Sequence, residues 1–542
     1  MSARRIGACL LLAAAAGCGA GDATDSGEME CANGENTAPA TPTIRAPAPY
    51  TIDAVPDDVV IRTSAFADGD AEDHHVASEI EIWRWAGGEP VMLVWKAHRE
   101  EPDALTQVAL ADGTFEVGSA LEERAIYAVQ ARYRDAGSCS AWSEWSAPRT
   151  FRTDDGSRYW LGGTVRDIEL DIPPASWDAI DAEAVPPDCV PFERSYHTGS
   201  VTLDGETFEG VGVRGKGGCG SARHLDGKAG FKISLEWDDP DVEGCPDEQR
   251  SHGLERFTLN NMVQDASFVH EHLAYALFRS VGVPAPRTTH VRLTVNGELW
   301  GLYNGVETVD RRMLWRWFDD DRGMLYEGTY WCDLVANNIP PDETDSTDYC
   351  ISREFHPSEC ATPDPGADPE TYEPVRGLVA ALDALPDDDF YPAIEQVMEF
   401  DTFLSMWSVE ALINHWDGYV GDIQNNYRIY HDPSSGRWTI LPSGADQTFS
   451  DGSLAVSGLV ASRCWNEEDC RAAYQARLAE VIDVFEQDDL SAMASSLRDK
   501  IADDVMADPR KETSFDGFSS SVDATIGFIQ ARPDQMRGQL PP

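Results

Sequence analysis

The chain has 542 residues, of which 95 are acidic and 42 basic, so its formal net charge is −53. A charge of this sign and size repels a phosphate backbone, and we therefore expect no nucleic-acid partner. The length is sufficient for two or three domains with their own cores. Solubility, or adaptation to salt or to a charged envelope surface, explains the acidity most simply.

The first residues, "MSARRIGACLLLAAAAGC", have the pattern of an export signal. Two arginines precede an apolar run that is too short to span a bilayer, and small residues lead to Cys18. This end resembles the bacterial lipoprotein cleavage box, which implies removal of residues 1–17 and acylation of Cys18. Gly19 after the acylated cysteine fits an outer-membrane or cell-surface location. We expect an exported lipoprotein that is bound to the membrane through its lipid.

The cysteine count favours disulfides. Without Cys9 and Cys18, ten of the 12 cysteines remain, an even number in a chain bound for an oxidising compartment. Cys464 and Cys470 form a candidate local pair, and two of Cys189, Cys219 and Cys245 are close enough in sequence to bridge. A structural zinc site is less favoured because the chain contains no CxxC spacing.

Residues 18–42 are poor in large apolar side chains and are expected to form a flexible tether. Residues 43–153 contain short alternating segments such as "ASEIEIWRW" and "IYAVQARYRD", which predict an all-β sandwich. The segment ends in "SAWSEWSAPRTFRT" and resembles a fibronectin type III domain. We expect its aromatic residues to serve core and strand packing rather than ligand binding.

From residue 159 to 542 the pattern becomes mixed α+β. Strands are predicted in "TFEGVGVRGKG" and "KAGFKISLEW", and the two-residue period places Lys228, Gly230 and Lys232 on the face away from the core. "DASFVHEHLAYALFRSVGVP" predicts a helix that ends at Gly282.

Asn296-Gly297 predicts a two-residue hairpin turn. That register pairs Leu293 with Trp300 and Val291 with Leu302, and it directs Glu307 away from the apolar face. Residues 332–375, with Cys332, Cys350 and Cys360, are interpreted as a disulfide-pinned insertion. "DTFLSMWSVEALINHW" predicts a helix that leads into the stretch "NHWDGYVGDIQNNYRIY".

This stretch has the residues that a phosphoryl-transfer site needs. Asp417 follows the helix, Asn425 and Asn426 come a few positions later, and a predicted hairpin leads to Asp446. Kinases use a loop carboxylate as base, an Asn and an Asp to bind Mg²⁺, and an upstream strand lysine at the phosphates. Each residue has an ordinary structural alternative, as a turn residue, a helix cap or a strand-end carboxylate. The chain has neither a DFG sequence nor a GxGxxG loop, and its base-to-Asn spacing exceeds that of ordinary protein kinases.

Over residues 159–542 the chain resembles the CotH kinase family, named for spore coat protein H, whose members are atypical secreted or surface protein kinases. The matching pieces, in the family's order, are "GVGVRGKG" with "GKAGFKISLEW", "LNNMVQDASFVHEHLAYALFRSVGVPAP", "VNGELWGLYNGVETVD", "NHWDGYVGDIQNNYRIY" and "WTILPSGADQTF". The resemblance implies an atypical protein-kinase-like α+β domain after the fibronectin-like sandwich.

The resemblance also implies roles for individual residues. Asp417 matches the catalytic base, and Asn426 and Asp446 match the residues that bind Mg²⁺ or Mn²⁺. Lys228 matches the lysine that contacts the nucleotide phosphates, with Arg214 and Lys232 as further nucleotide contacts, and Glu307 matches the glutamate after the hairpin. The chain departs from the family's Trp-Asp-x-Asp element, because Ser443 and Gly444 replace its first two residues.

The resulting hypothesis is a kinase that transfers the γ-phosphate of ATP to Ser or Thr of envelope or coat proteins. ATP is scarce outside the cytoplasm, so an exported kinase needs another donor or acts before or during export. The alternative is a non-catalytic surface binding or adhesion lipoprotein on a kinase-like scaffold. A weaker third idea is a calcium-stabilised structural protein that uses the acidic runs 68–73 or 319–323.

Overall fold

The structure is a computed structural model that describes residues 37–540 with gaps. The predicted signal 1–17, Cys18 and most of the tether therefore lie outside the described residues, as does the acidic run 319–322. Within the span, the residues that are not described are 48–58, 71–72, 87–88, 101–104, 119, 123–124, 137–140, 154–156, 161–162, 184, 186–191, 193, 219, 236, 238–250, 252–253, 319–322, 345–347, 355–370, 422 and 453–455.

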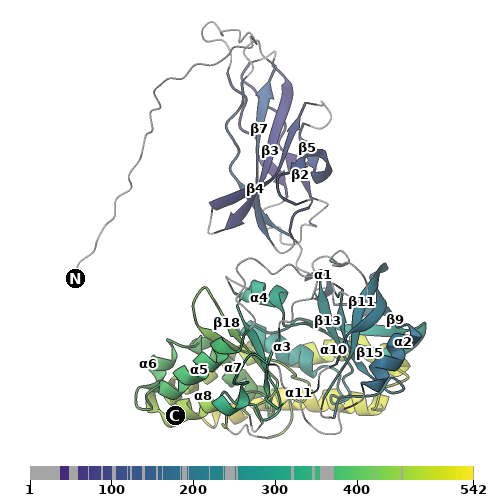
Figure 1. The fold of residues 1–542 in the computed structure, drawn as a ribbon, viewed down its shortest axis with the longest axis vertical. Helices are drawn as coiled ribbons and strands as arrows, with labels where there is room; N and C mark the ends of the chain where they lie inside the picture. The colour runs from purple at the N-terminus through teal and green to yellow at the C-terminus, as the bar shows by residue number, and fades with distance from the viewer. Residues whose placement is uncertain are drawn as a thin grey trace, which may run out of the picture.

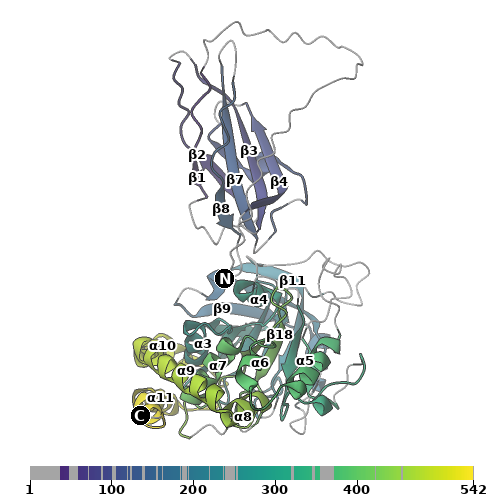
Figure 2. The same cartoon turned by 90° about the vertical axis from the view of Figure 1, so that its left-hand side faces the viewer.

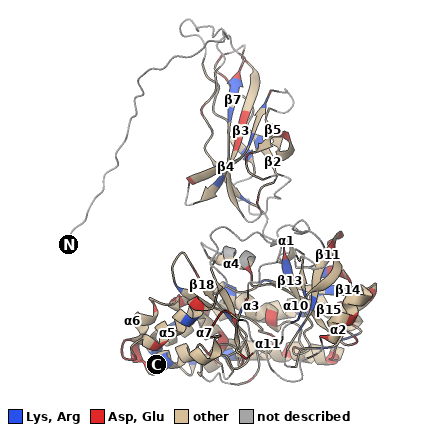
Figure 3. Cartoon of the chain, in the orientation of Figure 1, with Lys and Arg blue, Asp and Glu red and all other residues tan. Residues whose placement is uncertain are grey.

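The chain folds into an N-terminal part made of strands and a larger mixed part (Figure 1). Acidic residues occur on elements of both parts (Figure 3). In the N-terminal part, a sheet of order β1-β2-β5 and a sheet of order β6-β4-β3-β7-β8 share one apolar core. The strands are β1 Ile44–Ala46, β2 Val60–Thr63, β3 His75–Ala86, β4 Glu89–Arg99, β5 Gln107–Ala109, β6 Thr114–Phe115, β7 Ile126–Asp135 and β8 Arg149–Arg152.

The aromatic residues of this part are divided between its core and its surface. Tyr127 and Phe151 lie in the shared core, as predicted. Trp142 and Trp145 instead stack on a strand arginine, because the guanidinium of Arg132 lies 4.8 Å and 4.7 Å from their ring centroids. These tryptophans therefore pack against β7 and not between the sheets.

The larger part begins with a closed barrel of order β10-β11-β12-β13-β15-β14-β9. Alternate residues such as Val213, Phe231, Leu259 and Leu293 are buried in one apolar cluster. Their neighbours along the strands therefore point out of the barrel. The strands are β9 Arg166–Asp171, β10 His197–Leu203, β11 Glu206–Lys216, β12 Gly230–Ser234, β13 Arg256–Asn260, β14 Thr288–Val295 and β15 Glu298–Glu307.

The rest of the larger part is a sheet of order β17-β16-β18-β19 surrounded by helices. Helices α9, α10 and α11 lie side by side (Figure 2), and α10 packs against β15 of the barrel (Figure 1). The strands are β16 Leu325–Gly328, β17 Ile351–Arg353, β18 Tyr427–His431 and β19 Trp438–Pro442. The helices are α1 Ser157–Trp160, α2 Pro174–Ala182, α3 His270–Ser280, α4 Arg311–Trp317, α5 Glu373–Ala384, α6 Phe390–Ile394, α7 Phe400–Ile413, α8 Leu459–Asn466, α9 Glu468–Gln487, α10 Leu490–Ala507 and α11 Phe515–Arg537.

Strands β11 and β12 and helices α3 and α7 confirm the predicted element types, but α3 begins only at His270 and β12 only at Gly230, inside the predicted segments. The hairpin β14–β15 is also present, but its predicted register is wrong beyond the turn. Leu293 pairs with Gly301 and Val291 with Tyr303, because a bulge follows Leu293. Gly301 has φ +129°, and a Cβ there would lie 2.1 Å from a carboxylate oxygen of Asp508. The approach of Asp508 thus requires glycine at position 301, next to the bulge.

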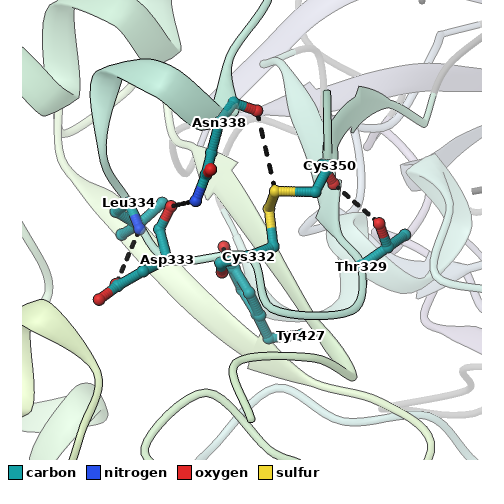
Figure 4. The surroundings of a disulfide bond; sticks show 7 residues. All are labelled: Thr329, Cys332, Asp333, Leu334, Asn338, Cys350 and Tyr427. Atoms are coloured by element: carbon teal, nitrogen blue, oxygen red, sulfur yellow. Dashed lines mark hydrogen bonds between the residues drawn. A yellow bond between two sulfur atoms is a disulfide. The ribbon is translucent and has the colours of Figure 1, made fainter. Parts of the chain in front are cut away.

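Disulfides join Cys332 to Cys350 and Cys464 to Cys470. The first bridge fixes the start of the predicted insertion, where the hydroxyl of Tyr427 donates a hydrogen bond to the carbonyl of Cys332 at 2.8 Å (Figure 4). Strand β17 then pairs with β16, so the insertion extends the sheet. Cys360 and the predicted group Cys189, Cys219 and Cys245 lie outside the described residues.

Candidate functional site

The loop that carries Asp417 begins at a firmly held helix end. Asn414 caps α7 in the left-handed conformation, with φ 53°, and its amide donates to the carbonyl of Ser450 at 3.2 Å. Arg532 of α11 donates to the carbonyls of Ala411 at 2.7 Å and Leu412 at 3.0 Å. These carbonyls have no partner inside the helix, so α11 fixes the point from which the loop departs.

Asp417 and Asn426 lie together in the structure. The side-chain amide of Asn426 donates to Oδ2 of Asp417 at 2.7 Å and to the carbonyl of Gly444 at 3.2 Å. Asp417 is only 4% exposed, and burial raises its pKa to about 7. A carboxylate that titrates near neutrality is suited to accept a proton from a hydroxyl.

The hairpin β18–β19 returns the chain from Asn426 to Asp446. The backbone N–H of Ser443 donates to the carbonyl of Asn426 at 2.8 Å. Gly444 has φ +55°, and a Cβ there would lie 2.4 Å from Cγ and Oδ1 of Asn426. The residue that replaces the family's first acid therefore provides the space that the Asn426 side chain occupies.

Asp446 is close to a second carboxylate, Glu271 of α3. Burial and the charge of Glu271 together raise the pKa of Asp446 to about 8, although the charge of Lys216 opposes them. Glu271 is 5% exposed, and its Oε2 accepts hydrogen bonds from the amides of Asn260 at 2.7 Å and Asn304 at 2.8 Å. Sequence reasoning missed Glu271. The apolar neighbours of Glu271 in "HEHLAYALF" were the sequence feature that could have indicated a buried carboxylate.

The outer face of the barrel brings cations to the same region. Arg214 pairs with Lys232 across β11 and β12, and Lys216 pairs with Gly230 at the end of these strands. Burial and the charge of Arg214 lower the pKa of Lys232 to about 8. Lys216 was also missed, although it lies in the quoted stretch "GVGVRGKG".

This face continues to the sheet β16–β18 through acidic and basic groups. Arg428 of β18 lies 2.7 Å from Glu327 of β16 and 3.3 Å from Glu354, and all three are partly buried. The charges of both glutamates act on Lys232 and oppose the fall in its pKa. Arg214 and Lys232 therefore lie in a charged network that connects the barrel to the sheet carrying Asn426.

The structure does not bring Lys228 to this group. Its ammonium is 1% exposed and lies 2.6 Å from Oδ2 of Asp508. Burial lowers the pKa of Lys228, and the Asp508 charge opposes that shift. Asp508 also accepts from the backbone N–H of Leu302 at 3.1 Å. Lys228 is thus buried beside Asp508, and its contact with the nucleotide phosphates stays a prediction.

Glu307 is held by two arginines. Its carboxylate accepts from Arg287 at 2.7 Å and from Arg316 at 2.6 and 2.7 Å, and it is 6% exposed. Burial alone would raise the pKa of Glu307, but the charges of Arg316 and Arg287 outweigh burial and lower it to about 2. These contacts with Arg287 and Arg316 fix the end of β15, and the catalytic assignment of Glu307 stays a prediction.

Glu307→Gln is expected to destabilise the chain in a pH-dependent way. The folded pKa of about 2 lies below the ordinary value of about 4.3, so the ionised carboxylate stabilises the fold by about 3 kcal/mol above pH 4. This stabilisation is lost as the pH falls from about 4 towards 2. Urea unfolding at several pH values measures the effect, with Glu298→Gln at the exposed start of β15 as control. A pH-independent difference from wild type would contradict the assignment.

Oxygen ligands of the kind that Mg²⁺ prefers are present around Asp446. Asp446 offers a carboxylate, Asn426 offers an amide oxygen, and the repulsion between Asp446 and Glu271 would be relieved by a cation. These residues fit a divalent metal. Three acidic groups with oxygens within 4.8 Å of one another occur, among the described residues, at Asp68, Asp70 and Asp73. That cluster falls in the run 68–73, where the calcium prediction remains untested.

No helix in the described part of the chain combines the length and the apolar character that crossing a membrane requires.

A sequence model of the family described as CotH kinase protein matches residues 213–536. Among curated proteins, Invasin CotH2 of Rhizopus delemar is 26% identical over 270 residues, which is 46% of this chain and 40% of the invasin. The inner spore coat protein H of Bacillus subtilis is 19% identical over 301 residues, which is 53% of this chain and 79% of that protein. The aligned region thus spans less than half the length of the invasin.

Solved structures give only weak likenesses. A chain from the Shewanella oneidensis toxin–antitoxin complex of HipA, HipB and operator DNA aligns with a TM-score of 0.23 and 13% identity, covering 59% of this chain and 66% of that one. The proinflammatory kinase CtkA of Helicobacter pylori aligns with a TM-score of 0.22 and 9% identity, covering 59% and 92%. Scores this low do not establish a shared fold.

Proposed function

The chain belongs to the CotH kinase family, and from this premise we propose that it is an atypical protein kinase that uses ATP and Mg²⁺ or Mn²⁺. The observation that carries the proposal is the group formed by Asp417, Asn426 and Asp446 at the ends of α7, β18 and β19. Its acceptors are Ser and Thr hydroxyls of envelope or coat proteins.

The residues divide the chemistry between them. Asp417 accepts the proton of the acceptor hydroxyl, because its carboxylate is buried and its pKa lies near neutrality. Asp446 and Asn426 would hold the metal, which neutralises charge on the transferred phosphoryl group when bound. Lys216, Arg214 and Lys232 hold the phosphates from the barrel face, and Glu271 is kept in place by Asn260 and Asn304.

Nucleotide binding tests this arrangement before any transfer is measured. We expect ATP with Mg²⁺ to raise the unfolding temperature of the chain, and Lys216→Met to weaken binding about 10-fold because one phosphate contact is lost. Calorimetric titration measures the affinity, and Lys96→Met in the N-terminal part is the matched control. Unchanged affinity in Lys216→Met would contradict the role of Lys216. Absence of binding in wild type would contradict the kinase proposal.

We also propose that the protein is located at the cell surface, on the basis of its disulfides and its N-terminal sequence. Disulfides such as Cys332–Cys350 persist in oxidising compartments, and the N-terminal signal would supply export and a lipid anchor at Cys18. The N-terminal part is proposed to be a fibronectin type III-like sandwich. Its two sheets and the stacking of Trp142 and Trp145 on Arg132 support this.

Non-catalytic adhesion is the second candidate. It is favoured by Gly444, which stands where family members carry an acid, and by the name invasin of one relative. The calorimetric titration with ATP separates the kinase from the adhesion protein, because an adhesion protein without catalysis has no need of metal-dependent ATP binding.

A further inference from the structure

A buried histidine lies directly behind Asp417. His415 is fully buried, and its Nε2 lies 3.5 Å from Oδ1 of Asp417. Its other ring nitrogen, Nδ1, lies 3.7 Å from Oε1 of Glu410 on α7. The imidazole therefore stands between two carboxyl groups, one from the helix and one from the loop.

Glu410 is a buried carboxyl group with a fixed position. Its Oε1 accepts from the backbone N–H of Tyr419 at 3.2 Å and its Oε2 from that of Val420 at 3.0 Å. A Cβ at Gly418 would lie 2.4 Å from Glu410 Oε1 and 2.8 Å from His415 Nδ1. The loop can pass this group only because residue 418 is a glycine.

The polar atoms of this group are not satisfied in the resting geometry. Both ring nitrogens of His415 and Oδ1 of Asp417 are buried without a hydrogen bond of normal geometry, and the backbone of Gly444 also interacts with the His415 ring. Buried polar atoms of this kind are rare and costly, and their hydrogen bonds at catalytic sites often tighten only when substrate is bound. Movement of less than 1 Å would bring both gaps to hydrogen-bond length.

We propose that His415 is a positioning residue for the kinase base: its Nε2–H donates a hydrogen bond to Oδ1 of Asp417, and its Nδ1 accepts a hydrogen bond from the protonated carboxyl of Glu410. This inference rests on the proposed kinase function. With Oδ1 held by His415 and Oδ2 held by Asn426, the plane of the Asp417 carboxylate is fixed. A lone pair on its oxygens stays available for the acceptor hydroxyl.

The protonation states agree with this arrangement. Burial raises the pKa of Glu410 to about 8, so the carboxyl group is protonated at neutral pH and can donate a hydrogen bond. Burial lowers the pKa of His415 to about 4, which keeps the imidazole neutral with one donor and one acceptor nitrogen. Glu410 and His415 are therefore both neutral neighbours of Asp417.

The test compares two substitutions that differ in the donor they leave. His415→Gln places an amide donor near the position of Nε2, whereas His415→Phe fills the same space without a donor. We expect His415→Phe to lower kcat about 10- to 100-fold with unchanged KM for ATP, and His415→Gln to restore most of kcat. His74→Phe, at an exposed site in the N-terminal part, is the control. Equal loss in both variants, or none in His415→Phe, would overturn the proposal.

A second measurement does not depend on activity. The urea midpoints of His415→Phe, Asp417→Asn and the double variant form a cycle. We expect the double variant to shift the midpoint by less than the sum of the single shifts, because each single change removes the same contact. Additive shifts would overturn the contact even if the chain transfers no phosphate. Absence of transfer by wild type would instead overturn the proposed function alone.

Discussion

Asp417→Asn is expected to lower the rate of phosphoryl transfer about 100- to 10,000-fold while leaving metal-dependent ATP binding unchanged. An asparagine fits the same space and keeps an oxygen near Asn426, but it cannot take the proton of the acceptor hydroxyl. Single-turnover transfer and calorimetric titration on the same preparation measure the two quantities.

Asp446→Asn is the matched comparison. We expect this variant to weaken metal-dependent ATP binding and also to slow phosphoryl transfer. Asp446 would bind the metal, and its carboxylate has Glu271 and Lys216 as charged neighbours. Transfer that survives in Asp417→Asn would contradict the base assignment. A loss of binding in Asp417→Asn equal to that in Asp446→Asn would show that Asp417 belongs to the metal site instead.

Lys228→Met is expected to destabilise the chain by about 3–5 kcal/mol, since it leaves the carboxylate of Asp508 buried and without its cation. The double variant Lys228→Met/Asp508→Asn is expected to recover most of this loss because the uncompensated charge is gone. Urea unfolding measures both.

The same variants separate two roles of Lys228. If Lys228 acts only through Asp508, the double variant binds ATP like wild type. If Lys228 also contacts the phosphates, the double variant folds but binds ATP about 10-fold more weakly or worse. Lys511→Met, at the same turn, removes a positive charge without breaking the pair and serves as control. Equal stability of Lys228→Met and wild type would contradict the ion pair.

The sequence predicted the parts of the fold that depend on local pattern. Strands β11 and β12 and helices α3 and α7 follow from apolar spacing, because each buries one face against a core. Pairing across the β14–β15 hairpin was wrong because a bulge follows Leu293, beside Gly301, which Asp508 approaches from more than 200 residues away. No local pattern contains that contact.

In the candidate site, too, local pattern predicted some residues correctly and failed where a distant contact decides the position. The two-residue period correctly placed Gly230 and Lys232 on the polar face of β12, but it placed Lys228 there as well. Lys228 precedes the strand, where the period no longer applies, and a partner 280 residues away buries it. Glu271 escaped notice because a glutamate on a helix is usually solvated, and only the folded chain sets it beside Asn260 and Asn304.

Transfer of labelled γ-phosphate from ATP to a Ser/Thr acceptor protein, measured with Mg²⁺ or Mn²⁺ and with the metal removed by chelation, tests the central claim most directly. The account predicts metal-dependent labelling of Ser or Thr by wild type that is lost in both Asp417→Asn and Asp446→Asn. Labelling that persists in these variants, or a wild-type chain that binds ATP with neither metal and labels nothing, would contradict it.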